Sequence, residues 1–387
     1  MQTESDRLKA LPPYLFAEID RKKKAAVAAG RPVINLGIGD PDTPTPAFII
    51  EAAQEAVADP ATHQYALDRG DARFRDSIAA FFQKRFGVSL DPDTEILPAQ
   101  GTKDTLSHLP MAMMNPGDVG LSPDPGYPVY NSSIRFAGGE VVRFPLTAER
   151  GFLPDLEAID SGALARAKLI YLNYPNNPTA AAAPHEIYEQ AVAWARQREV
   201  LIAQDAAYSE VYFEEPPISI LEIDGARDVA VEFHSLSKTF NMTGWRVGWV
   251  AGNPDVIASL VRLKSNMDNG VFTAMQRAGA AALDGYDRPE IQALRDMYKR
   301  RRDCLVAALE AAGLQVNRPQ AAFYVWVTCP AGLDSRAFAD RLLAEADIVA
   351  TPGIGYGACG EGFVRFALTV PEEKLEEAAG RIERLAF

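Results

Sequence analysis

The chain has 387 residues, more than one ordinary hydrophobic core accommodates, and 48% hydrophobic and 24% charged residues are typical of a globular protein. Its net charge of −13 argues against a nucleic-acid or anionic-membrane partner. The three cysteines are scattered without metal or disulfide spacing, and no apolar run reaches membrane length. We therefore expect a cytoplasmic protein without a metal site.

The N-terminal segment predicts an extended arm, a helix and a short strand. Pro12 and Pro13 favour an extended arm, and a helix follows through about Ala29. Residues 33–36 are typical of a strand, and residues 37–42 predict a turn whose glycines let a ligand approach the main chain. An ordinary strand-to-loop turn is the alternative for this last segment.

Short apolar runs alternate with helical patterns through the middle of the chain. Such alternation implies a mostly parallel sheet with helices on both faces, whose ligands bind beyond the carboxyl ends of the strands. The predicted strands are 96–97, 119–121, 140–144, 167–172, 200–203, 229–233 and 247–251, and the predicted helices are 47–59, 71–86, 101–114, 184–197 and 263–282.

The C-terminal part predicts a smaller α+β unit. A long helix over 290–312 precedes a strand at 323–327 and a helix at 335–345, and an antiparallel edge strand over 363–368 leads to a final helix at 371–385. We predict an α/β protein with three parts: an N-terminal arm and part of the small domain (1–45), a large domain (46–285) and a small C-terminal domain (286–387).

The segment from His234 to Gly248 surrounds one lysine with two serines and an arginine. Lys238 has the company that an imine-forming lysine needs, because low exposure and a nearby cation keep the amine partly uncharged. Ser235, Ser237 and Arg246 offer donors for an anion. An imine-forming lysine beside a phosphate site indicates pyridoxal phosphate. A loop lysine with chance neighbours is the alternative.

Further segments that follow predicted strands carry side chains suited to the same site. Residues 101–103 (Gly-Thr-Lys) open a helix, whose N-terminus favours a phosphate, although threonine is also a routine N-cap. Asp205 ends a strand, 33 positions before Lys238, with Tyr208 one helical turn later. Arg365 lies in an apolar strand and must be paired, either with a ligand or in a structural ion pair.

The pattern Ser-Leu-Ser-Lys-(x)7-Arg-Val-Gly resembles the lysine segment of the class I/II aminotransferases, the fold-type I pyridoxal-phosphate enzymes. The resemblance implies that Lys238 carries the cofactor, that Asp205 faces its ring nitrogen and that Tyr208 donates to its phenolic oxygen. The further cofactor contacts that it implies are Gly101, Thr102, Lys103, Tyr127, Asn177, Ser235, Ser237 and Arg246, together with Tyr65 of a second subunit.

Tyr65 in that role requires a homodimer with shared sites, although a half-buried aromatic is the commoner reading of one tyrosine. For the substrate, the resemblance pairs Arg365 with the α-carboxylate of an amino acid or 2-oxo acid, near Ile38, Gly39 and Asn177. It implies ping-pong transfer of the amino group.

Over nearly the whole chain, the sequence is most similar to the LL-diaminopimelate aminotransferases, which act in lysine biosynthesis. Tyr14, Asp68 and Asn269 are candidates to contact the second amino-acid end of such a substrate. An aspartate- or alanine-type aminotransferase and a pyridoxal-phosphate β-lyase remain alternatives. The stretches that carry the similarity are 11–16, 35–41, 175–180, 205–210 and 234–248.

Two further protein classes lack their usual signals in this sequence. A cofactor-binding regulator module usually comes with a basic DNA-binding domain, and the sequence contains no such domain. A nicotinamide reductase would need G-x-G-x-x-G after its first strand, and the sequence has no such motif there.

Overall fold

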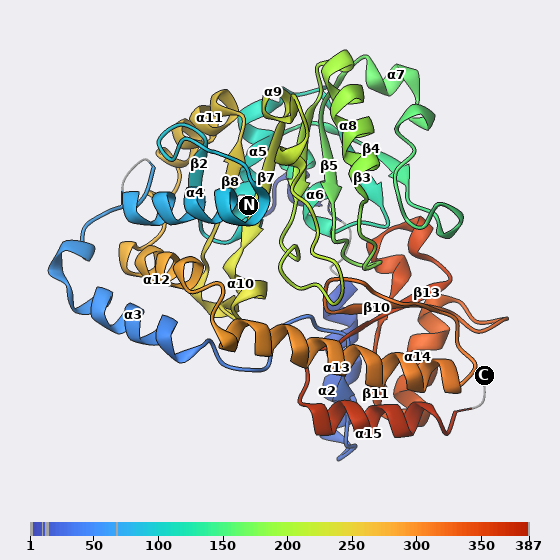
Figure 1. Cartoon of the computed structure of the whole chain (residues 1–387). Helices are drawn as coiled ribbons and strands as arrows, with labels where there is room; N and C mark the ends of the chain where they lie inside the picture. Colours follow the sequence, from blue (N-terminus) through green and yellow to red (C-terminus); the bar gives the residue numbers. More distant parts are fainter. Residues whose placement is uncertain (1–2, 10, 12–14, 67–68, 386–387) are drawn as a thin grey trace.

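The computed structural model describes residues 3–9, 11, 15–66 and 69–385. Two sheets organise this part of the chain, a seven-stranded sheet in the upper half of Figure 1 and a four-stranded sheet below it. The predictions for Tyr14 and Asp68 lie outside the described residues.

The seven-stranded sheet is mostly parallel, as the alternating pattern predicts. Its order is β2-β8-β7-β6-β5-β3-β4, and only β8 runs antiparallel, to both of its neighbours. The strands are β2 (Ile96–Ala99), β3 (Val119–Asp124), β4 (Glu140–Pro145), β5 (Ala167–Asn173), β6 (Leu201–Asp205), β7 (Ala230–Ser235) and β8 (Gly248–Gly252).

Helices cover both faces of this sheet, because successive strand residues point to opposite sides. Phe82 and Trp249 belong to the core on one face, whereas Tyr130 and Leu260 belong to the core on the other. The first face carries α4 (Ala72–Phe86), α8 (His185–Arg198) and α12 (Thr273–Asp284), and the second carries α5 (Thr102–Met113), α6 (Pro128–Phe136) and α11 (Pro254–Lys264). Two short helices, α7 (Ser161–Leu164) and α9 (Ala226–Val229), lie in the connections.

The smaller sheet is antiparallel, with the order β12-β13-β10-β9, and has its own hydrophobic core. A separate parallel pair joins β1 (Ile34–Asn35) to β11 (Ile348–Val349), which ties the N-terminal segment to this region. The elements are β9 (Val316–Asn317), β10 (Tyr324–Thr328), β12 (Thr351–Pro352), β13 (Phe363–Ala367), α13 (Pro289–Ala311), α14 (Ser335–Ala346) and α15 (Glu372–Ile382).

Two predicted elements differ from the structure. The predicted edge strand 363–368 is wrong in its position, because β13 pairs with β10 on one side and with the two-residue β12 on the other. The predicted helix 263–282 is wrong too, because α11 ends at Lys264 and α12 begins only at Thr273. The start signal of α11 was overlooked: the side chain of Asn253 caps it, and Pro254 occupies its first turn.

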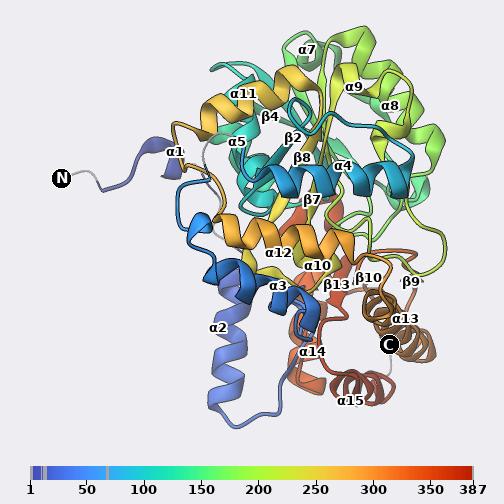
Figure 2. The same cartoon turned by 60° about the vertical axis from the view of Figure 1, so that its left-hand side comes forward.

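The N-terminal elements lie at the margin of the molecule. Figures 1 and 2 both show α3 (Ala47–Ala58) running alongside α12, whereas α1 (Asp6–Lys9) stands away from both sheets in Figure 2. The helix after the predicted arm is α2 (Leu15–Ala28). Within the described ranges, no helix combines the length and apolarity that crossing a membrane requires.

Candidate active site

The predicted site residues gather where three neighbouring strands of the larger sheet end. Asn173 ends β5, Asp205 ends β6, and Lys238 lies in the short helix α10 (Leu236–Thr239) directly after β7. Asn173 and Asp205 are register partners, so the two chain segments leave the sheet side by side. This location agrees with the expectation that ligands bind beyond the carboxyl ends of parallel strands.

Lys238 is partly buried, and its amine meets the turn that follows β1. Its Nζ donates a hydrogen bond to the carbonyl oxygen of Gly39 at 3.2 Å. Desolvation by burial lowers the pKa of Lys238 from 10.5 to about 8; the negative charge of Asp40 opposes this effect, and the positive charges of Arg246 and Arg365 add to it. A substantial fraction of neutral amine near neutral pH is what nucleophilic lysine chemistry requires.

Asp205 is a buried carboxylate with two neutral donors. The hydroxyl of Tyr130 donates to its Oδ2 at 2.8 Å, and the backbone N–H of Ala207 donates to its Oδ1 at 3.2 Å. Burial raises the pKa of Asp205 to about 6, against the lowering effect of these two hydrogen bonds. A carboxylate at this position offers a strong acceptor to a protonated group of a ligand.

Arg365 reaches across from β13 of the smaller sheet toward the larger one. Its Nη1 donates to Oδ1 of Asn177 at 2.7 Å, and its Nη2 donates to the carbonyl oxygen of Gly37 at 2.8 Å. Its Nε is buried and has no hydrogen-bond partner. No carboxylate of the described residues pairs with this arginine, which argues against the structural ion pair and leaves a donor for an anionic ligand.

Tyr208 and Tyr324 join the two sheets through their hydroxyls, which lie 2.9 Å apart. The guanidinium carbon of Arg365 lies 4.0 Å from the centre of the Tyr324 ring. A Cβ atom at Gly39 would overlap the Tyr324 hydroxyl, so the turn after β1 requires glycine at this position. These contacts bring Gly39, Tyr208 and Arg365 into one cluster.

A second cluster combines a helix N-terminus with an arginine. Gly101 precedes the first turn of α5 with φ +77°, and a Cβ atom there would lie 2.5 Å from Nη2 of Arg246. Gly248 lies directly beneath, since its Cβ would be 3.3 Å from the Thr102 nitrogen. Ser235 caps α10 by accepting a hydrogen bond from the Ser237 nitrogen at 3.2 Å. We call Gly101, Thr102, Ser235, Ser237 and Arg246 the anion cup.

The remaining predicted residues lie around these clusters. Tyr127 precedes α6 with its ring centre 5.7 Å from that of Tyr130. Lys103 is exposed on the first turn of α5. Ile38 is also exposed, and its carbonyl oxygen accepts a hydrogen bond from Thr369. Tyr65 is 75% exposed, and Asn269 is exposed with φ +56° in the turn between α11 and α12.

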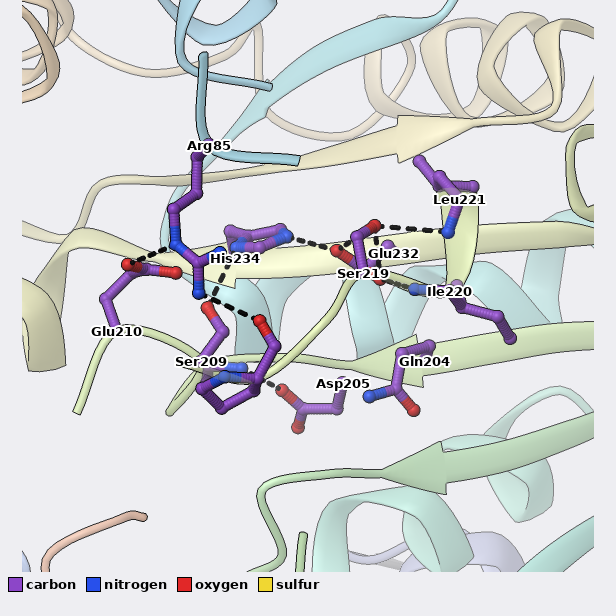
Figure 3. A network of polar contacts seen from close by, with 12 residues as sticks. Arg85, Gln204, Asp205, Ser209, Glu210, Ser219, Ile220, Leu221, Glu232 and His234 are labelled. Atoms are coloured by element: carbon purple, nitrogen blue, oxygen red, sulfur yellow. Dashed lines mark hydrogen bonds and ion pairs between the residues drawn. The ribbon is translucent and has the colours of Figure 1, made fainter. Parts of the chain in front are cut away.

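A buried polar network backs the cluster at Asp205. Figure 3 shows His234 between Ser209 and Glu232, and Glu232 also accepts hydrogen bonds from the side chain of Ser219 and the nitrogen of Ile220. All these side-chain groups are nearly inaccessible to solvent. Because each of these polar groups has a partner, the network fixes the strand end that carries Asp205.

Sequence reasoning gave no role to Tyr130 or Tyr324, although both touch predicted site residues. Tyr130 comes one helical turn after Tyr127, but no local pattern shows that its hydroxyl faces Asp205. Tyr324 lies in an apolar strand, and the only sequence signal there is a hydroxyl group that must find a hydrogen-bond partner when buried. Their partners lie far away in sequence, so only the fold reveals the contacts.

Comparison with known proteins agrees with this geometry. The family model for aminotransferase class I and II matches residues 31–382. The LL-diaminopimelate aminotransferases of Nitratidesulfovibrio vulgaris (strain DP4) and Aquifex aeolicus (strain VF5) are 52% and 50% identical to this chain, and each alignment covers 98% of both proteins.

Solved structures are similar over the same length. Substrate-bound BacF from Bacillus subtilis superposes with a TM-score of 0.95 at 39% identity and covers 100% of this chain and 99% of that chain. A single mutant of Thermus thermophilus aspartate aminotransferase gives a TM-score of 0.93 at 32% identity and covers 99% of this chain and 100% of that chain. The chain therefore belongs to the class I and II aminotransferase family and has its fold-type I architecture.

Proposed function

We propose that this aminotransferase uses pyridoxal phosphate to move an amino group between LL-diaminopimelate and 2-oxoglutarate. The observation that carries the proposal is the lysine amine of Lys238, whose lowered pKa leaves it partly neutral between Gly39 and the two arginines Arg246 and Arg365. A solvated surface lysine would gain nothing from such surroundings.

The residues fit pyridoxal phosphate at three points. The anion cup, where Gly101 leaves room beside Arg246, suits the phosphate. Asp205 suits the protonated ring nitrogen, and the hydroxyl of Tyr208 and the amide of Asn177 suit the phenolic oxygen. When bound, the cofactor supplies an aldehyde that takes up the amino group and a ring that accepts electrons.

Three side chains of the protein have separate roles in the transfer. The fork of Arg365, with its unpaired Nε, holds the α-carboxylate of the amino acid. The neutral Nζ of Lys238 removes the proton from Cα of the bound amino acid and keeps it for return. Asp205 keeps a proton at the ring nitrogen, because a buried carboxylate stabilises a cation beside it. A second 2-oxo acid then binds through the same contacts, and the transfer runs in the reverse direction. Two such half-reactions predict ping-pong kinetics.

Diaminopimelate is proposed as the amino donor because the relatives at 52% and 50% identity carry that name. Such a donor has a second amino-acid end, for which Tyr14, Asp68 and Asn269 are the candidate contacts. The alternative is an aspartate-type enzyme, which the Thermus thermophilus structure supports at the lower identity of 32%.

The proposal includes a cytoplasmic homodimer with shared sites. Apolar side chains that a partner would cover are exposed at Tyr65, Met267 and Phe272. Ala66 adjoins Gly270, and the carbonyl oxygen of Gly270 accepts a hydrogen bond from Gln100, the residue before the anion cup. We propose that Tyr65 reaches the anion cup of the neighbouring subunit. We also propose that residues 286–387, with part of 1–45, move as a domain against 46–285.

A panel of amino donors with 2-oxoglutarate tests the substrate. We expect LL-diaminopimelate to give the highest kcat/KM, with glutamate formed in equal amount, and Lys238→Ala to lose both turnover and the visible absorption of the bound cofactor. Activity with aspartate or alanine alone would remove diaminopimelate and keep the transaminase. Release of ammonia without 2-oxoglutarate would favour a β-lyase, and a wild-type protein that stays colourless with the cofactor would refute the whole proposal.

A further inference from the structure

A tyrosine to which the proposed function gives no role makes the closest side-chain contact of Asp205. The hydroxyl of Tyr130 donates to Oδ2 of Asp205 at 2.8 Å. Tyr130 is fully buried and Asp205 is 5% exposed, so water does not compete for this bond. The contact joins α6 on one face of the sheet to the end of β6.

We propose that Tyr130 is a positioning residue, whose hydroxyl keeps Asp205 ionised and aims its carboxylate at the ring nitrogen of the cofactor. The inference rests on the proposed function, since it concerns the role that Asp205 has there. It extends that function to a residue on α6, an element that carries none of the proposed reacting groups.

The ring of Tyr130 is held in one place. It stacks on the ring of Tyr171, with 4.6 Å between ring centres and 16° between planes. Tyr171 is itself fixed, because its hydroxyl donates to the carbonyl oxygen of Leu106 and lies 3.1 Å from the Ser133 hydroxyl. The stack therefore fixes where the hydroxyl oxygen of Tyr130 lies, 2.8 Å from Oδ2 of Asp205, and the O–H turns toward this acceptor.

The two carboxylate oxygens of Asp205 have different partners. Oδ1 accepts from the nitrogen of Ala207 within its own turn, whereas Oδ2 accepts from Tyr130 on another element. The first bond is local to the turn, so it does not fix the carboxylate relative to the rest of the site. The second bond sets the angle of the carboxylate plane relative to the sheet, and therefore sets where the free lone pairs point.

The buried surroundings of Asp205 disfavour its charged form, and a hydrogen-bond donor at this position opposes that effect. Burial raises the pKa of Asp205, and the bond from Tyr130 is the largest effect that opposes it. Burial and the charge of Asp205 raise the pKa of Tyr130 well above 10, so the phenol remains a donor. The titratable groups that face Asp205 from the surrounding elements are Tyr130, Tyr171, Tyr208, His234 and Lys238.

The consequence concerns one proton, which the ring nitrogen and Asp205 share. A hydrogen bond to the carboxylate stabilises its anionic form, and so favours the proton on the nitrogen. Without that bond the proton moves toward Asp205, and the ring becomes a weaker electron acceptor. A bond to a charged group in a buried site is large enough to shift this balance about ten- to hundredfold.

Tyr130→Phe tests the inference in the holoenzyme, since it removes the hydroxyl and keeps the ring stack. With cofactor labelled with ¹⁵N at the ring nitrogen, we expect the nitrogen resonance to move toward the unprotonated form. We also expect kcat to fall about ten- to hundredfold with a smaller change in KM. Tyr174→Phe is the matched control: it removes another buried tyrosine hydroxyl, one that donates to the carbonyl oxygen of Phe152 and is not part of this stack, and we expect the wild-type resonance.

Incorporation of 3-fluorotyrosine at position 130 gives a second arm that keeps the fold. Its more acidic phenol is a stronger donor, so we expect the resonance to move toward the protonated form. A wild-type resonance in both position-130 proteins, or the same change in Tyr174→Phe as in Tyr130→Phe, would overturn the inference. Failure of the wild-type protein to bind the cofactor is a different result, and it would refute the proposed function.

Discussion

At the scale of single residues, the site depends on charges that oppose one another around Lys238. Asp40 raises the pKa of its amine, whereas Arg246 and Arg365 lower it further after burial has done so. The two arginines are also the residues proposed to hold the two anionic ends of the ligands. The groups that bind the ligands therefore also prepare the amine that reacts with them.

This balance predicts how the reactivity of Lys238 depends on pH. The neutral amine reacts with aldehydes, so trapping by pyridoxal and borohydride should reach half its maximal rate near pH 8. Asp40→Asn removes a charge that raises the pKa and should move the midpoint to lower pH. Arg246→Gln should move it to higher pH. Mass spectrometry of the labelled peptide measures the rate, and pyridoxal without phosphate avoids the anion cup.

Lys24 provides a control in the same samples. Its hydrogen bond and ion pair with Asp20 raise its pKa, so it should label at higher pH than Lys238. A common midpoint for the two lysines, or shifts of both variants in one direction, would contradict the electrostatic explanation.

At the scale of elements, the glycine and the arginine of the anion cup lie at the ends of two strands that run in opposite directions. β2 leads into Gly101, whereas β8 begins just after Arg246 and pairs antiparallel with β2. Both residues have a positive φ: Arg246 (φ +56°, ψ 52°) is left-handed, whereas Gly101 (φ +77°, ψ 158°) has an extended conformation that essentially only glycine adopts. This geometry lets the guanidinium lie against the α5 N-terminus.

Gly101→Ala should weaken cofactor binding in addition to destabilising the fold. The added methyl would displace Nη2 of Arg246, at the flexible end of that side chain. The backbone conformation at Gly101 should cost alanine about 1–3 kcal/mol of unfolding free energy, and loss of the arginine contact should weaken pyridoxal phosphate binding at least about tenfold. Denaturant unfolding and equilibrium dialysis measure the two effects separately.

Gly87→Ala is the control, because Gly87 has φ +69° at the end of α4 and open space around its Cβ position. It should lower the free energy of unfolding by about 1 kcal/mol, the cost of alanine in the left-handed region, and leave the dissociation constant of the cofactor unchanged. Equal weakening of binding in the two variants would exclude a specific role of Gly101 in the cup.

The sequence predicts elements whose signals are local. Three features could be predicted from the sequence because each depends on neighbouring residues: the alternation of strands and helices, the motif around Lys238 and the unusual Arg365. The central position of β13 could not be predicted, because its second partner strand, β12, has only two residues. The contact of Tyr130 with Asp205 likewise depends on the packing of α6 across the sheet.

At the scale of the whole molecule, the site joins the two sheets. Lys238 and Asp205 follow strands of the larger sheet, whereas Arg365 and Tyr324 come from the smaller one. The turn after β1 is tied to the smaller sheet, because Thr351 donates a hydrogen bond to the carbonyl oxygen of Gly37. A substrate that Arg365 and Lys238 hold at once therefore opposes separation of the two sheets.

Mixing two inactive variants tests whether sites are shared between subunits. Tyr65→Ala and Lys238→Ala should each be nearly inactive alone. In a hybrid dimer, one site combines the intact Lys238 of one subunit with the intact Tyr65 of the other. Refolding an equal mixture should therefore recover about a quarter of the wild-type activity. Activity no higher than the sum of the two variants would show that each site is complete within one chain.

The antiparallel strand β8 also has a consequence for how the protein is made. Gly101 leaves the ribosome long before Arg246, and β8 cannot join β2 to β7 until the chain has been extended to Gly252. At ordinary rates of translation, the nascent chain waits roughly ten to thirty seconds with half of its cup exposed. The proposed cofactor, pyridoxal phosphate, can thus bind only late in synthesis. A chain that is truncated before β8 should not retain it.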